Sequence, residues 1–173
     1  MSFATKADVD AVGNEMPWVE RAVSKTMYEF VNSVAERHGK RPGISFQLTS
    51  GPKDKAETLS WQEFRNKSVQ TANLFRNLGI GENDVVAYLL PICNEAALTL
   101  IGGSIAGIAN PINPLLEPEQ IAAILRESNA KVLVTLKGFP KTDLAQLAAD
   151  AVAEAPNVKT VLEVDLNRYL SPP

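Results

Sequence analysis

The residues with the most obvious chemical potential lie in a glycine-rich stretch, LTLIGGSIAGIANPINP, at positions 98–114. Glycine-rich loops can hold phosphate groups with their backbone N–H groups, and a Walker-type loop requires glycine, four residues and then Gly-Lys-Ser/Thr. Gly102 and Gly107 have the required glycine spacing, but Ile108 and Ala109 occupy the lysine and hydroxyl positions. The stretch is therefore not predicted to bind a nucleotide.

Two further glycine patterns also fail as nucleotide motifs. The dinucleotide fingerprint needs a middle glycine where this stretch has Ser104. A second partial match begins with Gly79 and Gly81, but Asp84 stands where its third glycine belongs. The glycines at 102 and 103 fall inside a predicted helix, where each costs about 1 kcal/mol relative to alanine. We therefore expect them to permit close packing between backbone segments.

The chain has one cysteine and one histidine. Cys93 follows the apolar run VVAYLLPI, so it is predicted to be a small buried residue, and His38 is predicted to end a helix. Asp143 and Asp150 lie seven residues apart on a predicted helix, where a solvated face is the expected role. No catalytic, cofactor-binding or metal-ligating residue is predicted in this chain.

Composition indicates a water-soluble protein without a nucleic-acid partner. The net charge is −3 and the isoelectric point is near 5.3, so no overall positive field favours nucleic acid or anionic lipid. The nearest approach to a basic cluster is Lys40, Arg41, Lys53 and Lys55, in two predicted turns. The most apolar stretch, 96–109, is too short to cross a membrane, which takes about 20 residues. We expect a cytoplasmic location.

Residues 1–20 are predicted to be a poorly structured N-terminal extension, acidic and without the apolar segment of a secretory signal. The apolar spacing over Val23–His38 predicts a helix. Alternation over 44–50 predicts a strand, and AETLS at 56–60 is predicted to return as its antiparallel partner. A capping box of Ser60 and Glu63 then opens a long helix.

The rest of the chain alternates between apolar strands and amphipathic or buried helices, which implies a largely parallel sheet. Residues 21–173 are thus predicted to form an α/β domain, a parallel sheet flanked by helices with an N-terminal hairpin. Strands are expected at 85–90, 107–113, 131–136 and 159–164, and helices at 94–106, 117–128 and 142–154.

From Thr58 to Thr135 the sequence resembles the N-terminal region of the adenylate-forming enzymes, particularly the acyl-CoA synthetases. TLSWQEFRNKSVQTANLFRNLGIGENDVVAYLLP is similar to their capped helix, Leu-Gly turn and first core strand. AGIANPINPLLEPEQIAAILRESNAKVLVT is similar to their Ala-Gly turn, Asn-Pro segment, next helix and next strand. One departure is Ile92, where the family often has asparagine between a proline and a glutamate, here Pro91 and Glu95.

The resemblance implies part of a larger N-terminal domain of a ligase for fatty or other carboxylic acids. Members of that family use ATP and Mg²⁺ to form an acyl-adenylate and pyrophosphate, and a thiol such as that of CoA then displaces AMP. Their phosphate-binding loop, aromatic ATP segment, hinge region and C-terminal lysine would all lie downstream of Pro173. The chain alone is expected to bind none of these cofactors and to be inactive.

Three alternatives stay open at this point. A stand-alone flavodoxin-like module would bind a ligand at the carboxyl ends of its strands without further sequence. A scaffold domain would present an apolar surface to a protein partner. Another adenylate-forming branch, a luciferase or a peptide-synthetase module, would differ only in downstream sequence. Neither the acyl substrate nor the oligomeric state is predicted.

Overall fold

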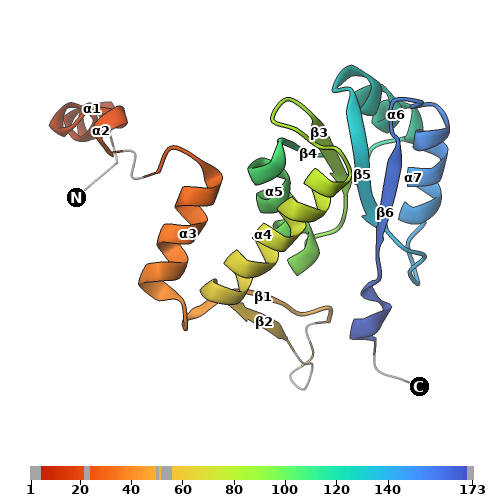
Figure 1. The fold of residues 1–173 in the computed structure, drawn as a ribbon, viewed down its shortest axis with the longest axis horizontal. Coiled ribbons are helices and arrows are strands. Elements are labelled where there is room, and N and C mark those ends of the chain that lie inside the picture. The colour runs from red at the N-terminus through yellow and green to blue at the C-terminus, as the bar shows by residue number, and fades with distance from the viewer. Residues whose placement is uncertain (1–4, 22–23, 50, 52–55, 171–173) are drawn as a thin grey trace.

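The computed structural model describes residues 5–21, 24–49, 51 and 56–170. Within this part of the chain, four parallel strands form one sheet in the order β4-β3-β5-β6 (Figure 1). The strands are β3 (Val85–Leu89), β4 (Ile108–Pro111), β5 (Ala130–Leu136) and β6 (Thr160–Val164). The prediction of a largely parallel α/β sheet is confirmed.

Helices cover both faces of this sheet. Helices α4 (Trp61–Asn77) and α5 (Asn94–Ala106) lie on one side, and α6 (Pro118–Glu127) and α7 (Leu144–Ala153) lie on the other (Figure 1). The central strands β3 and β5 are accordingly buried along nearly their whole length. This burial explains why their sequences are continuous apolar runs rather than alternating ones.

The strand order reverses at β3. Strand β4 pairs with one edge of β3, and the chain then crosses to form β5 along the other edge. In open parallel sheets such a reversal leaves a crevice outside the carboxyl ends of the two strands that separate there, here β3 and β5. The topology therefore indicates where a ligand would bind.

The predicted hairpin is present as a separate two-stranded sheet. Strands β1 (Pro42–Phe46) and β2 (Glu57–Ser60) pair antiparallel. The prediction of a strand over 44–50 is wrong at its end, since β1 stops at Phe46. The turn expected at 51–55 lies mostly outside the described residues, as do Lys53 and Lys55.

Helix α3 (Met27–His38) starts later than the predicted Val23–His38, because the Thr26 side chain accepts a hydrogen bond from the Glu29 backbone and caps it there. Val23 itself lies outside the described residues. Only Val31 and Ala35 of this helix are buried. The buried face of α3 is therefore narrower than the apolar face predicted from its sequence.

The expectation that residues 1–20 are poorly structured is wrong for those that the structure describes. Helix α1 (Lys6–Glu15) is followed by α2 (Trp18–Arg21). Thr5 and Asp8 form a capping box at the start of α1, with the Asp8 carboxylate accepting from the Thr5 backbone at 3.0 Å. None of the residues of α1 is buried, so local capping rather than packing accounts for this helix.

Candidate functional site

The glycine-rich stretch is a packing element. A Cβ atom built at Gly102 would lie 2.7 Å from the Thr71 side chain, and one at Gly107 would lie 2.5 Å from two backbone carbonyl oxygens. Gly103 is similarly close to Ala109, at 3.1 Å. The glycines thus let α5 approach α4 and β4 closely, as the sequence predicts. The Gly107 N–H donates to the Gly103 backbone oxygen at 2.8 Å, so this group is already bonded within the protein.

The candidate site lies instead at the carboxyl ends of the parallel strands. A cleft of about 510 Å³ opens there, a volume typical of small-molecule sites. Because its walls include residues that follow β3, β4 and β5, it occupies the crevice that the strand reversal predicts. Its apolar lining residues are Phe46, Leu48, Pro91, Ile92, Pro114, Leu115, Leu136, Phe139, Pro140, Leu144 and Leu166.

Two walls of the cleft come from different parts of the fold. Phe46 and Leu48 belong to the hairpin side, whereas Leu136 and Leu144 belong to β5 and α7 on the sheet side. A short 3₁₀ helix, η1 (Leu166–Tyr169), follows β6 and places Leu166, which is 2% exposed, between them. The site is therefore bounded by two separate sheets.

The rim combines apolar and polar groups. Ile92 is 95% exposed at the edge of the cleft, and Leu115 is also strongly exposed. Lys141, Thr142 and Asp143 supply polar groups on the loop after β5. Such a cleft suits a mainly apolar ligand with few polar groups.

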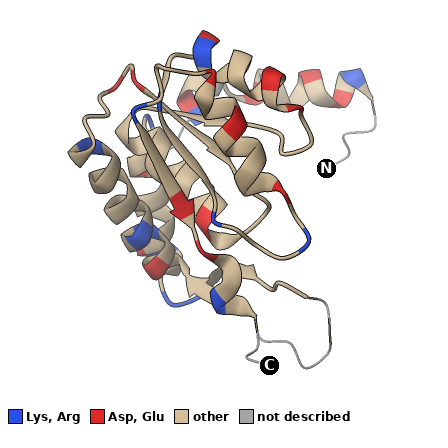
Figure 2. Ribbon diagram, turned by 90° about the vertical axis from the view of Figure 1, so that its right-hand side faces the viewer, with Lys and Arg blue, Asp and Glu red and all other residues tan. Residues whose placement is uncertain are grey.

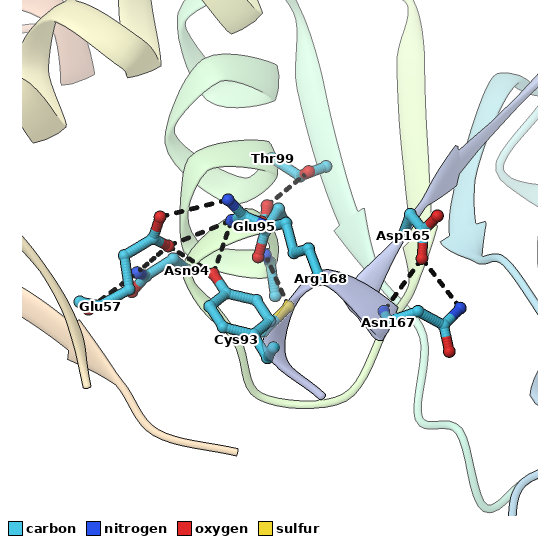
Figure 3. A network of polar contacts seen from close by, with 10 residues as sticks. Glu57, Cys93, Asn94, Glu95, Thr99, Asp165, Asn167 and Arg168 are labelled. Atoms are coloured by element: carbon cyan, nitrogen blue, oxygen red, sulfur yellow. Dashed lines mark hydrogen bonds and ion pairs between the residues drawn. The ribbon is translucent and has the colours of Figure 1, made fainter. Parts of the chain in front are cut away.

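A polar network lies beside the cleft wall that contains Phe46 (Figure 3). Arg168 of η1 donates to both carboxylate oxygens of Glu57 on β2, at 3.2 and 3.1 Å. The same guanidinium forms an ion pair with Glu95 at the start of α5. Tyr169 donates its hydroxyl to Glu57 and stacks edge-on against Phe46, with ring centroids 5.0 Å apart. Segments far apart in the sequence thus meet at one guanidinium.

The start of α5 is ordered around the same network. Asn94 is buried and donates to the backbone oxygen of Glu57 at 3.2 Å and to its carboxylate at 3.0 Å. The sulfur of Cys93 caps the helix by accepting from the Ala96 backbone at 3.4 Å. The Thr99 hydroxyl donates to the Glu95 backbone oxygen at 2.8 Å.

The environment shifts the pKa values of this cluster. Burial opposes ionisation of Glu57, but hydrogen bonds from Tyr169 and Asn94 and the charge of Arg168 outweigh it, so the pKa of Glu57 is lowered. Burial and the hydrogen bond to Glu57 raise the pKa of Tyr169. Burial also raises the pKa of Cys93 to about 11. At neutral pH the cluster therefore holds an ionised Glu57 and a protonated thiol.

The remaining residues named from the sequence are Cys93, His38, Asp143, Asp150 and Asp84. Cys93 is buried as predicted, and His38 lies in the last turn of α3 as predicted. Asp143 and Asp150 are exposed on α7 and its N-terminal flank, and Asp150 accepts a hydrogen bond from Gln146 at 2.8 Å. Asp84 pairs with Lys131 at 2.6 Å in the turn before β3.

Sequence reasoning missed Glu57, Arg168 and Tyr169 as partners. They are up to 112 residues apart, and neither hydrophobic periodicity nor local motif spacing carries information on such contacts. In the sequence, Glu95 matches the family pattern, but that match predicts no partner for it. Arg168 follows β6, a strand without fully buried residues, so no local pattern marked it.

Charges elsewhere are interspersed, with Lys and Arg next to Asp and Glu along the ribbon (Figure 2). Among the described residues, no group of three or more His, Cys, Asp or Glu side chains is arranged to hold a metal ion. Within the same part of the chain, no helix has the length and apolar character to span a membrane.

Comparison with known proteins identifies the family. A family model described as AMP-binding enzyme matches residues 31–171. Marinolic acid–CoA ligase of Pseudoalteromonas sp. (strain SANK 73390) is 32% identical over 120 residues, which are 69% of this chain and 18% of that protein. 4-Coumarate–CoA ligase 1 of Arabidopsis thaliana is 37% identical over 89 residues, which are 51% of this chain and 16% of that protein.

Two solved structures share the fold. The anthranilate CoA ligase AuaEII in complex with anthranoyl-AMP has a TM-score of 0.67 at 19% identity, with 92% of this chain and 27% of that chain covered. A long-chain-fatty-acid-CoA ligase (FadD1) from Archaeoglobus fulgidus has a TM-score of 0.68 at 19% identity, with 80% and 27% covered. The fold is thus one that adenylate-forming CoA ligases contain.

The chain belongs to the AMP-binding enzyme family, which confirms the resemblance drawn from its sequence. It spans 16% to 18% of the length of the two curated relatives described above.

Proposed function

We propose that this chain is the N-terminal part of a CoA ligase that activates a carboxylic acid with ATP and Mg²⁺ and transfers the acyl group from AMP to CoA. The observation that carries the proposal is the AMP-binding match over residues 31–171. The relatives named above are CoA ligases, which favours this branch over a luciferase or a peptide-synthetase module. Their names cover different acids, so a fatty-acid substrate is one candidate among several.

In this proposal the chain supplies a scaffold rather than reacting groups. The parallel sheet and its helices hold the cleft walls in place, while the groups that bind ATP and stabilise the developing charge come from other parts of the ligase. No residue of this chain is assigned a catalytic role. A cytoplasmic location is proposed with it.

A stand-alone flavodoxin-like binding module is the second candidate. The specific observation in its favour is the order β4-β3-β5-β6 with a cleft at the point of reversal, because such sheets bind ligands at that point. In that case residues 1–173 would bind a ligand without any other polypeptide.

Calorimetric titration of residues 1–173 separates the two candidates. ATP with Mg²⁺ is added first, and then a non-hydrolysable acyl-adenylate analogue. Absence of binding heat at high micromolar ligand is the expected result, because the nucleotide-binding groups are proposed to lie elsewhere. One-to-one binding in the low micromolar range would overturn the proposal and favour the stand-alone module.

A further inference from the structure

The 3₁₀ helix η1, hereafter the strap (Leu166–Tyr169), is anchored on two sides. On the sheet side, Asp165 just before it pairs with Lys137 at 3.1 Å, and Asn167 donates to the Gly138 backbone oxygen at 3.1 Å. On the hairpin side, Arg168 holds the carboxylate of Glu57. The strap therefore bridges the two sheets whose residues form opposite walls of the cleft.

The hairpin-side anchor, hereafter the clamp, consists of Arg168, Tyr169, Glu57 and Glu95. The guanidinium lies 4.4 Å from the centre of the Tyr169 ring, and that ring packs edge-on against Phe46 in the cleft wall. The clamp thus connects directly to a side chain that lines the cleft. Any movement of β1 away from the strap would separate Phe46 from Tyr169.

Charge balance in the clamp depends on one residue. Glu57 and Glu95 are two carboxylates on different elements, and Arg168 is the cation that both of them contact. Their side chains are 34% and 20% exposed, so water screens them only in part. The second oxygen of Glu95 is buried without a hydrogen-bond partner among the described residues. Without the guanidinium, the two carboxylates would repel each other across the gap between β2 and α5.

We propose that Arg168 is a positioning residue that sets the width of the apolar cleft by holding the hairpin against the strap. With the clamp formed, Phe46 and Leu166 both line the cleft, and Phe46 packs against the core cluster that contains Leu166. When the clamp is broken, repulsion between Glu57 and Glu95 moves the hairpin outward and the cleft admits larger apolar groups. This inference concerns the chain itself and does not rest on the proposed ligase activity.

Double electron–electron resonance can measure the distance between the hairpin and the parallel sheet directly. Spin labels are attached at Ser45→Cys on β1 and Glu163→Cys on β6, both exposed positions. Cys93 is replaced by serine in every variant so that only the two introduced cysteines are labelled. The parent is expected to give one narrow distance distribution. Arg168→Gln is expected to give a broader distribution shifted to longer distance.

Three matched variants separate the charge mechanism from a general loss of structure. Lys137→Gln removes the ion pair on the sheet side of the strap and is expected to leave the distribution unchanged. Arg168→Lys retains a cation and is expected to stay close to the parent. Adding Glu57→Gln to Arg168→Gln removes the repulsion and is expected to move the distribution back toward the parent. Circular dichroism checks that each variant is folded.

A neutral apolar dye, N-phenyl-1-naphthylamine, reports the capacity of the cleft in the same variants. Severalfold stronger dye binding by Arg168→Gln than by Lys137→Gln would support the proposal. A folded Arg168→Gln protein with the parent's distance distribution would overturn it. So would a wider distribution that Glu57→Gln fails to narrow, because the clamp would then act by packing and not by charge.

Discussion

The most demanding test of the packing account is the substitution of Gly107 by alanine. A Cβ at this position would lie 2.5 Å from the backbone oxygens of both Gly81 and Asp84, and 3.0 Å from a methyl carbon of Ile80. These carbonyl groups cannot rotate away as a side chain could. They also take part in the turn before β3, where the Asp84 oxygen accepts from Ile108 at 2.9 Å.

The expected cost follows from these contacts. Overpacking a tight site costs about 1–3 kcal/mol, and a clash with two backbone oxygens belongs at the upper end. Replacing glycine by alanine also raises the free energy of unfolding by about 0.4–1 kcal/mol, because alanine reduces the conformational entropy of the unfolded chain. Gly107→Ala should therefore lower the free energy of unfolding by about 2 kcal/mol. With an m-value of about 2 kcal/mol/M in urea, the midpoint should fall by about 1 M.

The assay is urea unfolding followed by circular dichroism, with Gly138→Ala as the matched control. A Cβ at Gly138 would meet no atom within 4 Å, so this variant is expected to unfold at the parent midpoint or slightly above it. Equal midpoints for Gly107→Ala and Gly138→Ala would refute the reasoning, since they would show that the turn before β3 yields at little cost.

Three further predictions concern other parts of the fold. Gly79 has a φ of +85°, so Gly79→Ala should cost about 1 kcal/mol in urea unfolding, while Gly79→Asn should cost less. Cys93 caps α5 through its sulfur. Cys93→Ser should therefore unfold near the parent midpoint, whereas Cys93→Val should lower the free energy of unfolding by about 1 kcal/mol. A Cys93→Val protein with the parent's midpoint would show that the cap does not stabilise the fold. The hydrogen bond from Lys131 lowers the pKa of Asp84 in the folded protein. The Asp84–Lys131 pair therefore stabilises the fold at pH values above the pKa that Asp84 has in the unfolded chain, and this stabilisation is lost as the pH falls through the pKa of Asp84 in the folded protein. Urea midpoints between pH 7 and pH 3 should then fall less steeply for Lys131→Met than for the parent, and parallel curves would contradict this.

Local signals in the sequence predicted most of the parallel part of the fold. The capping box at Ser60 and Glu63 is formed, with the Glu63 carboxylate accepting from the Ser60 backbone at 2.8 Å. The predicted bounds of α5 match those observed, from Asn94 to Ala106. These features depend on residues within a few positions of one another, so a single sequence contains them.

Two features were missed for different reasons. The capping box of α1, formed by Thr5 and Asp8, is as local as that of α4, but no residue of α1 is buried, so hydrophobic spacing gave no signal for this helix. The clamp was missed because its partners, Glu57 and Arg168, meet only after the strand order has brought the hairpin beside the strap. Cleft position, by contrast, follows from the reversal of strand order at β3 once the topology is known.

The most direct measurement of the central claim is thioester formation by a grafted ligase. Residues 31–171 replace the matching segment of the Pseudoalteromonas marinolic acid–CoA ligase, and that ligase with its own segment re-inserted serves as the control. ATP-dependent acyl-CoA formation by the graft is the result predicted for a chain that forms part of a CoA ligase. A graft that is soluble and unfolds cooperatively but makes no acyl-CoA would contradict the account.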